Sequence, residues 1–182
     1  MASMFKKQIR FYGKHAVIMQ KYCRDKGGEQ EIPFSISNND GKTIDHFYIF
    51  ETRIQIYMVA AMLGIINKAS VEEDTDKSIY SSIMSEMIEK QRRKLERIYQ
   101  YMILSDDSLG SADAKIKKAF SIIPTDEECD VLQHKLEDYV RGGLEIIDNC
   151  FKECKTYEDI CNAILELNAS ISNVQVIDNF AI

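Results

Sequence analysis

The five cysteines are the residues of this chain best suited to chemistry, because thiolates bind metals and act as nucleophiles. Cys150 and Cys154 lie one helical turn apart, and Cys129 and Cys161 could join them by folding. A structural zinc site usually has closely spaced pairs of the CxxC type. These cysteines fall instead on apolar stripes of predicted helices, where cysteine behaves as a small hydrophobic residue. We therefore expect buried thiols, with no metal site and no cofactor.

The other residues that could support catalysis form no recognisable site. The three histidines are far apart in the sequence: His15, His46 and His134. A Cys–His nucleophile pair stays open, since such residues meet only in space, but no protease or nucleophile-elbow signature surrounds any cysteine. Asp106 and Asp107, like the acids at 126–128, stand where a helix dipole attracts carboxylates. No catalytic residue is predicted, and we expect a protein that is not an enzyme.

Two groups of basic residues are stronger candidates for a binding surface. The first group lies near the N-terminus, with Phe11 and Tyr12 interleaved: Lys6, Lys7, Arg10 and Lys14. The second lies on one predicted helix: Lys90, Arg92, Arg93, Lys94 and Arg97. Such groups could bind nucleic-acid phosphates with a steep salt dependence. The alternative is that Glu86, Glu89 and Glu96 pair with them along a solvated helix.

Charge is distributed unequally along the chain. Residues 1–28 carry seven bases against one acid, whereas residues 106–182 carry 16 acids against 7 bases, and the net charge is −6. This polarity allows an anionic partner or head-to-tail self-association, so a homo-oligomer stays open. A mixed solvated surface explains it equally well. The acidic total argues against nucleic-acid binding by the protein alone.

The sequence also favours a cytoplasmic protein without membrane contact. The most apolar run, residues 54–66, is broken by Gln55 and is shorter than the ~18 residues that a membrane span needs. The lysines near the N-terminus have no apolar segment behind them of the kind that signal peptides contain. The odd number of cysteines favours reduced thiols.

The sequence predicts an all-α single domain over residues 1–182. Two prolines and eight glycines are too few for the turns of an all-β chain, and the apolar residues recur at helical spacing. Five to six helices are expected around a buried apolar helix at 51–67. Four of the others are expected at 14–24, at 77–104, at 112–122 and from 156 to 167. The fifth is expected to start at 125 and to bend or end at Gly142 and Gly143. Residues 5–12 could be a strand or a helical turn, a minor hairpin is expected near 30–49, and residues 168–182 form a tail.

Two helix starts show the spacing of a capping box, in which a Ser or Thr side chain and a Glu three residues later satisfy free backbone groups. Ser70 with Glu73 precedes the helix expected at 77–104, and Thr125 with Glu128 precedes the next long helix. Gly142 and Gly143 lack the phosphate-loop pattern, so they indicate close helix packing or a bend.

Two stretches together resemble a known family. Residues 50–64 combine Phe50 and Thr52 with a helix that ends Ala60-Ala61-Met62-Leu63-Gly64, and residues 137–145 resemble a Y-A-N-G-G-L-E helix. This pairing is similar to small accessory proteins of bacterial DNA phosphorothioation (Dnd) modification and restriction loci. It covers residues 50–147 in outline and departs from the pattern at Val140 and Arg141. The resemblance implies a non-catalytic helper in a DNA-directed defence system.

The leading hypothesis is therefore a non-enzymatic accessory protein that contacts a larger protein partner through helix faces. The alternative is direct nucleic-acid binding by the basic residues of 90–97 and the basic N-terminal segment, 1–28. A small enzyme that uses cysteine or carboxylates is the third class, and no residue is assigned to it.

Overall fold

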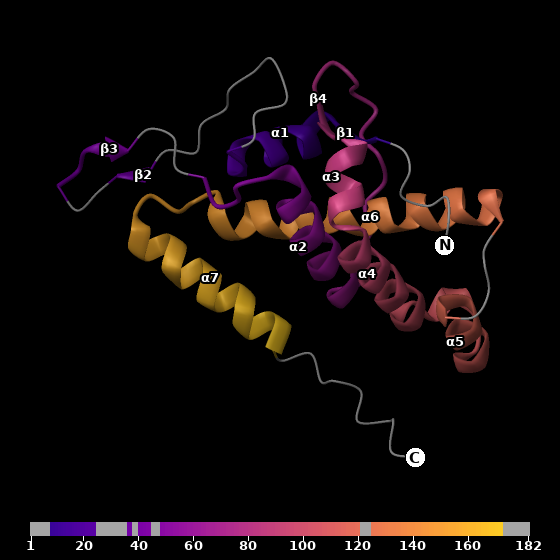
Figure 1. Ribbon diagram of the computed structural model, residues 1–182. Helices are drawn as coiled ribbons and strands as arrows, with labels where there is room; N and C mark the ends of the chain where they lie inside the picture. Colours follow the sequence, from indigo (N-terminus) through magenta and orange to yellow (C-terminus); the bar gives the residue numbers. More distant parts are fainter. Residues whose placement is uncertain (1–7, 25–35, 38–39, 45–47, 121–124, 173–182) are drawn as a thin grey trace.

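The computed structural model describes residues 8–24, 36–37, 40–44, 48–120 and 125–172. Within these ranges the chain is mainly helical, as predicted (Figure 1). The helices are α1 (Gly13–Tyr22), α2 (Arg53–Ile66), α3 (Ser85–Lys90), α4 (Arg92–Ser105), α5 (Ala112–Phe120), α6 (Asp126–Phe151) and α7 (Tyr157–Ser172). Antiparallel pairs join β1 (Ile9–Tyr12) to β4 (Tyr80–Ile83) and β2 (Ile36–Ser37) to β3 (Thr43–Ile44). None of the described helices is both long and apolar enough to cross a membrane.

Helices α2 and α6 form the centre of the fold. Figure 1 shows α6 running through the molecule with α2 crossing it, and the two form the most extensive helix pair in the described structure. The α2 sequence is apolar nearly all round, so Ile56, Tyr57 and Leu63 are fully buried, as predicted for a central helix. Helix α6 starts at the predicted capping box, in which Thr125 and Glu128 exchange hydrogen bonds.

Three glycines let α6 approach the backbone of α2 and of the segment just after it. A Cβ on Gly64 would overlap the carbonyl oxygen of Tyr139, and one on Gly143 would overlap that of Ala60. Gly142 faces the Ala69 carbonyl in the same way. The prediction of close packing at Gly142 and Gly143 is confirmed, and α6 continues through both residues without ending.

The helix predicted at 77–104 is wrong in its first third. Residues 80–83 form β4, in which Ile83 pairs with Ile9, and the helical part is divided at Gln91 into α3 and α4. A spacing of four between Ile79 and Ile83 fits a helix, but β1 offers Tyr80–Ile83 an antiparallel partner that periodicity alone does not reveal. Residues 5–12, for which the sequence allowed a strand or a turn, contain the strand β1.

The capping box predicted at Ser70 and Glu73 is also wrong, since no helix begins in residues 70–79. Acids in this segment serve a different helix. Asp74 accepts a hydrogen bond of 3.0 Å from the backbone nitrogen of Lys14, in the first turn of α1. The hydrogen bonds from the Asp76 and Lys14 backbones hold the pKa of the Asp74 carboxyl below its ordinary value.

The predicted hairpin and tail have different outcomes. The strands β2 and β3 confirm a minor hairpin within residues 30–49. Helix α7 continues to Ser172, so the first five residues of the predicted tail are helical. The rest of the tail, 173–182, lies outside the described residues.

Candidate functional site

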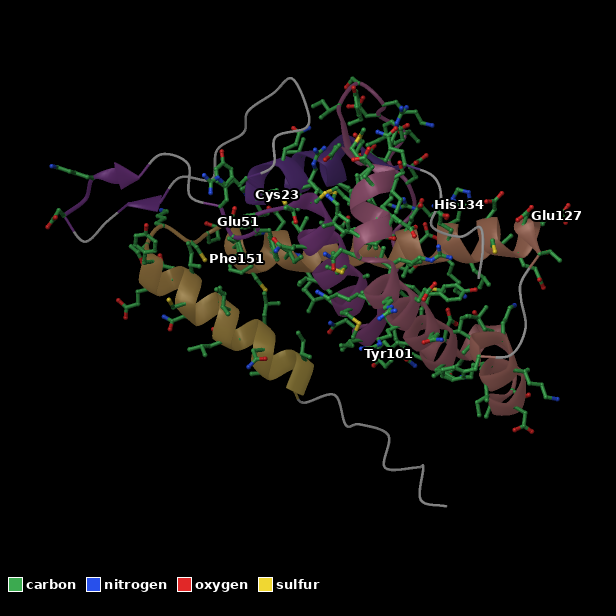
Figure 2. All side chains as sticks on the ribbon, in the orientation of Figure 1. Cys23, Glu51, Tyr101, Glu127, His134 and Phe151 are labelled. Atoms are coloured by element: carbon green, nitrogen blue, oxygen red, sulfur yellow. The ribbon has the colours of Figure 1, made fainter. Side chains whose placement is uncertain are left out.

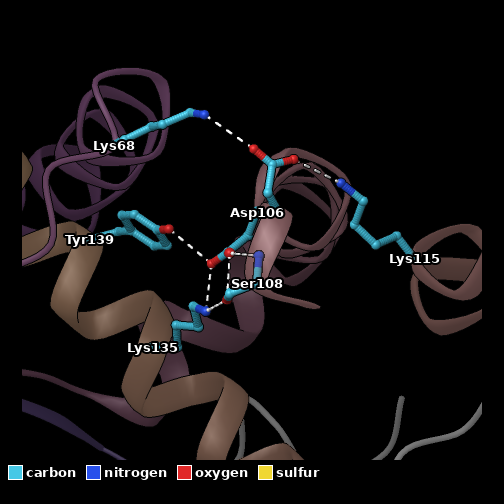
Figure 3. A network of polar contacts seen from close by, with 7 residues as sticks. Lys68, Asp106, Ser108, Lys115, Lys135 and Tyr139 are labelled. Carbon is cyan, nitrogen blue, oxygen red and sulfur yellow. Dashed lines mark hydrogen bonds and ion pairs between the residues drawn. The ribbon is translucent and has the colours of Figure 1, made fainter. Parts of the chain in front are cut away.

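A polar network joins the end of α4 to α6 (Figure 3). Asp106 is 8% exposed and lies at the start of a short 3₁₀ turn, Asp107–Leu109. Its carboxylate accepts hydrogen bonds from the Ser108 backbone at 2.8 Å and from the Tyr139 hydroxyl at 2.9 Å, and it lies 2.6 Å from Lys135 Nζ. Burial alone would raise the pKa of Asp106, but the hydrogen bonds, led by that from Lys135, hold it far below its ordinary value.

The neighbouring Asp107 extends this network to α2 and α5. Lys68 lies 3.3 Å and Lys115 lies 3.4 Å from its carboxylate oxygens, as Figure 3 shows. The hollow beside these residues is small, at about 160 Å³. Because the carboxylate of Asp106 is fully engaged and stays ionised, the network fixes the relative position of α2, α4, α5 and α6 and offers no general acid or base near neutral pH.

The cysteines lie mainly in the core. Cys23, Cys129 and Cys154 are buried and Cys161 is exposed, and burial raises the pKa of the Cys150 and Cys154 thiols. Among the described residues, no three His, Cys, Asp or Glu side chains are grouped so as to hold a metal ion. Raised thiol pKa values lower the thiolate fraction, so these two cysteines are poor nucleophiles.

The two described histidines contact glutamates. His15 is fully buried with Nε2 3.3 Å from Glu145, and burial lowers its pKa. His134 is largely exposed and lies 3.9 Å from Glu137, near the end of α6 that carries Glu127 (Figure 2). His46 lies outside the described residues. The hydrogen bonds and ion pairs of the two described histidines are with glutamates, and within the described residues none joins either histidine to a cysteine.

Two of the four residues of the predicted N-terminal basic group, Arg10 and Lys14, lie in the described part of the chain, and they have different partners. Lys14 Nζ lies 2.6 Å from Glu145, which neutralises its charge. The Arg10 guanidinium stacks over the ring of Tyr80 at 5.9 Å, on the β1–β4 ribbon. Lys6 and Lys7 lie outside the described residues. Of the two described members, only Arg10 is without a carboxylate partner in the described structure.

The second basic group does form one surface, around the junction of α3 and α4. Arg92 pairs with Glu89 at 3.3 Å and with Glu96 at 3.1 Å, as expected for a solvated helix. The remaining four cations are exposed and form no ion pair within the described ranges: Lys90, Arg93, Lys94 and Arg97. A shallow hollow of about 430 Å³ is lined by residues 89–94. We call these four residues the α3–α4 basic surface.

Helix α7 presents an apolar stripe that is only half covered. Ile160, Ala163, Ile164, Leu167 and Ile171 follow helical spacing on one face. Ile160 and Ala163 are buried in the same hydrophobic core as Phe151, which lies at the end of α6 from which α7 departs (Figure 2). Ile164 is 47% exposed and Ile171 is 37% exposed, whereas Leu167 between them is partly buried against the core. In the sequence, residues 160–167 fall on the last predicted helix and Ile171 falls in the predicted tail, and no exposure was assigned to them.

Comparisons of this chain with protein-family models, with curated proteins and with solved structures give no match.

Proposed function

We propose that this chain is a non-enzymatic interaction protein that docks to a larger protein partner through the apolar stripe of α7. The observation that carries the proposal is the exposure of the second half of this stripe. Isolated exposed apolar residues are common on proteins, but here two isoleucines continue the line of a stripe whose first half is buried. A partner that covered Ile164 and Ile171 would complete a surface that α6 leaves open.

The composition of α7 indicates the charge of this partner. The helix contains three acids, Glu158, Asp159 and Glu166, and no base. An apolar stripe with acidic flanks fits an amphipathic helix with lysine or arginine beside its apolar residues. The resemblance to accessory proteins of DNA phosphorothioation loci suggests that the partner belongs to a bacterial DNA-modification or defence system. That assignment is part of the proposal.

The absence of catalysis is also part of the proposal. It is supported by the saturated network at Asp106 and by the raised thiol pKa of Cys150 and Cys154. If the purified protein had a turnover activity and substitution of Asp106, Cys150 or Cys154 abolished it, the proposal that the protein is not an enzyme would be overturned.

The test is affinity capture with matched variants of α7. Ile164→Asp with Ile171→Asp places two charges on the stripe, whereas Asn162→Asp with Ala169→Asp places the same charges on the opposite face of the helix. Burying the exposed part of each isoleucine contributes about 1 kcal/mol, so the stripe variant should bind a partner about 30-fold more weakly.

The capture is read by mass spectrometry after nuclease treatment and repeated with the purified partner. A partner retained by the Asn162 and Ala169 control and lost by the stripe variant supports the proposal. Equal capture by both variants would refute docking through this stripe. Circular dichroism establishes that both variants keep the helical content of the parent.

A further inference from the structure

A second surface, on the α3–α4–α5 side of the molecule, extends the α3–α4 basic surface. Residues 89–97 contain five bases and two acids, and both acids, Glu89 and Glu96, are held by Arg92. Both acids within residues 89–97 are therefore already paired, and Glu86, one turn before Lys90, forms no ion pair in the described structure. The positive charge of Lys90, Arg93, Lys94 and Arg97 is left to face solvent around the hollow at the helix junction.

Helix α5 runs back along α4 and brings further cations to the same side. Lys115, near the start of α5, lies 3.4 Å from Asp107, just after α4 ends. One turn later, the backbone oxygen of Ala119 accepts a hydrogen bond of 3.3 Å from Gln100 in the middle of α4. The two helices are thus antiparallel, and the C-terminal end of α5 lies alongside the part of α4 that contains Gln100, one turn after Arg97.

The last turn of α5 carries two lysines and an exposed aromatic ring. Lys117 is exposed and Lys118 is half-buried, and neither has an ion pair in the described part of the chain. Phe120 is 61% exposed, one residue beyond the buried Ala119. An exposed phenyl ring close in sequence to cations provides a flat apolar surface on which another ring can stack.

We propose that this side of the molecule binds a single strand of nucleic acid, with the phosphates along Lys90, Arg93 and Arg97 and a base stacked on Phe120. Proteins that bind single strands combine a cationic path for the backbone with aromatic rings that stack on the bases. From residue 90 to residue 100 the path is roughly 15 Å long, at ~1.5 Å per helical residue, which accommodates a few nucleotides. A duplex keeps its bases stacked and offers no free face to Phe120, so a single strand fits better.

The test is fluorescence anisotropy with a labelled oligothymidylate of about 12 nucleotides at several salt concentrations. The full chain should bind with an affinity that falls as salt rises. Removal of one cation that touches a phosphate should reduce the salt slope by about 0.7. Arg93→Glu with Arg97→Glu should weaken binding more than tenfold and reduce the slope, whereas Lys152→Glu with Lys155→Glu, at the α6–α7 connection, should leave both unchanged.

Phe120→Ala separates stacking from charge. It should weaken binding about fivefold or more without changing the salt slope, and Phe120→Tyr should restore the parental affinity. Loss of affinity in the arginine variant but not in Phe120→Ala would overturn the single-strand assignment in favour of a general polyanion surface. Equal affinity for a duplex of the same length, or for polyglutamate, would also overturn the single-strand assignment. No binding at low salt would refute the proposal altogether, and it would leave the docking role of α7 untouched.

Discussion

The crossing of α2 and α6 makes the replacement of Gly143 by alanine the most informative stability test. The new Cβ would lie 2.8 Å from the Ala60 Cα and closer still to the Ala60 carbonyl oxygen. The atoms in its way belong to a helix backbone, so no side-chain rotation can relieve the overlap. The helices must separate along their whole contact, and this loosens the packing of fully buried residues such as Leu63 and Leu144.

Two opposing effects set the expected magnitude. Alanine favours a helix over glycine by about 1 kcal/mol. Overpacking in a close-packed core costs about 1–3 kcal/mol and more where the obstacle cannot move. We expect the cost to prevail, with Gly143→Ala lowering the free energy of unfolding by about 2 kcal/mol or more.

Urea unfolding followed by circular dichroism measures this change. With a slope of about 2 kcal/mol per molar, the midpoint should fall by about 1 M. Asn149→Ala, at an exposed site of the same helix, serves as the control and should change stability by less than about 0.5 kcal/mol. Gly64→Ala should behave like Gly143→Ala, and the double variant should lose less than the sum, because the first substitution already separates the helices. A Gly143→Ala midpoint equal to that of the parent would refute the close crossing.

Three further predictions concern titratable groups. The folded-state pKa of Asp106 is depressed, so the stability that its carboxylate contributes is present above the unfolded-state pKa near 3.8 and is lost as pH falls from there toward the folded-state pKa. Asp106→Asn should lower the free energy of unfolding by about 2 kcal/mol at pH 7. The variant should also lose less stability on acidification than the parent, which urea unfolding between pH 2 and 7 measures. Burial raises the pKa of Glu137, so the stability of the folded protein falls as pH rises from the ordinary value of 4.5 to the higher folded-state pKa. Glu137→Gln, which keeps the hydrogen bond from Gln133, should therefore raise the melting temperature more at pH 7 than at pH 4, and a constant difference would contradict this reasoning. In the native protein Cys161 should react fast with a disulfide reagent, and the buried Cys23, Cys129 and Cys154 should react only after unfolding in urea. Fast reaction that persists after both Cys161 and the half-buried Cys150 are replaced by serine would show that the core opens readily.

The central part of the fold could be predicted because its signals are local. An apolar stretch that covers all faces of a helix, as in α2, has no stable place except a core. The capping box at Thr125 fixes the start of α6 through residues three apart in the chain. Neither inference needs knowledge of a distant segment.

The β1–β4 ribbon and the division of α3 from α4 could not be predicted in the same way. Ile83 pairs with Ile9, more than 70 residues earlier, and nothing within residues 77–90 records that partner. Likewise Asp74 caps α1 from a segment that the pattern assigned to the start of another helix. In each case a non-local contact decided between two structures that the local pattern allowed.

The α3–α4 basic surface and the neighbouring end of α5 likewise combine features that the sequence reveals with features that only the structure reveals. The charges of residues 90–97 were visible in the sequence, but only the structure separates Arg92, which holds two glutamates, from the four cations that face solvent. Phe120 and Lys117 lie in the helix predicted at 112–122, and neither was predicted to belong to a binding surface. Their relation to Arg97 depends on the antiparallel course of α5 along α4, which the Gln100 and Lys115 contacts establish.

The two stretches behind the family resemblance coincide with the helix crossing. Ala60 and Gly64 on α2 meet Gly143 and Tyr139 on α6, so the A-A-x-x-G and G-G phrases supply the small residues that a backbone-to-backbone contact requires. Two helices that cross this closely in an unrelated protein would be under the same constraint. The resemblance therefore bears on how α2 and α6 pack, and evidence for function has to come from residues that packing leaves unconstrained. Ile164, Ile171 and Phe120 are such residues, since each is a large apolar side chain that the fold itself does not bury.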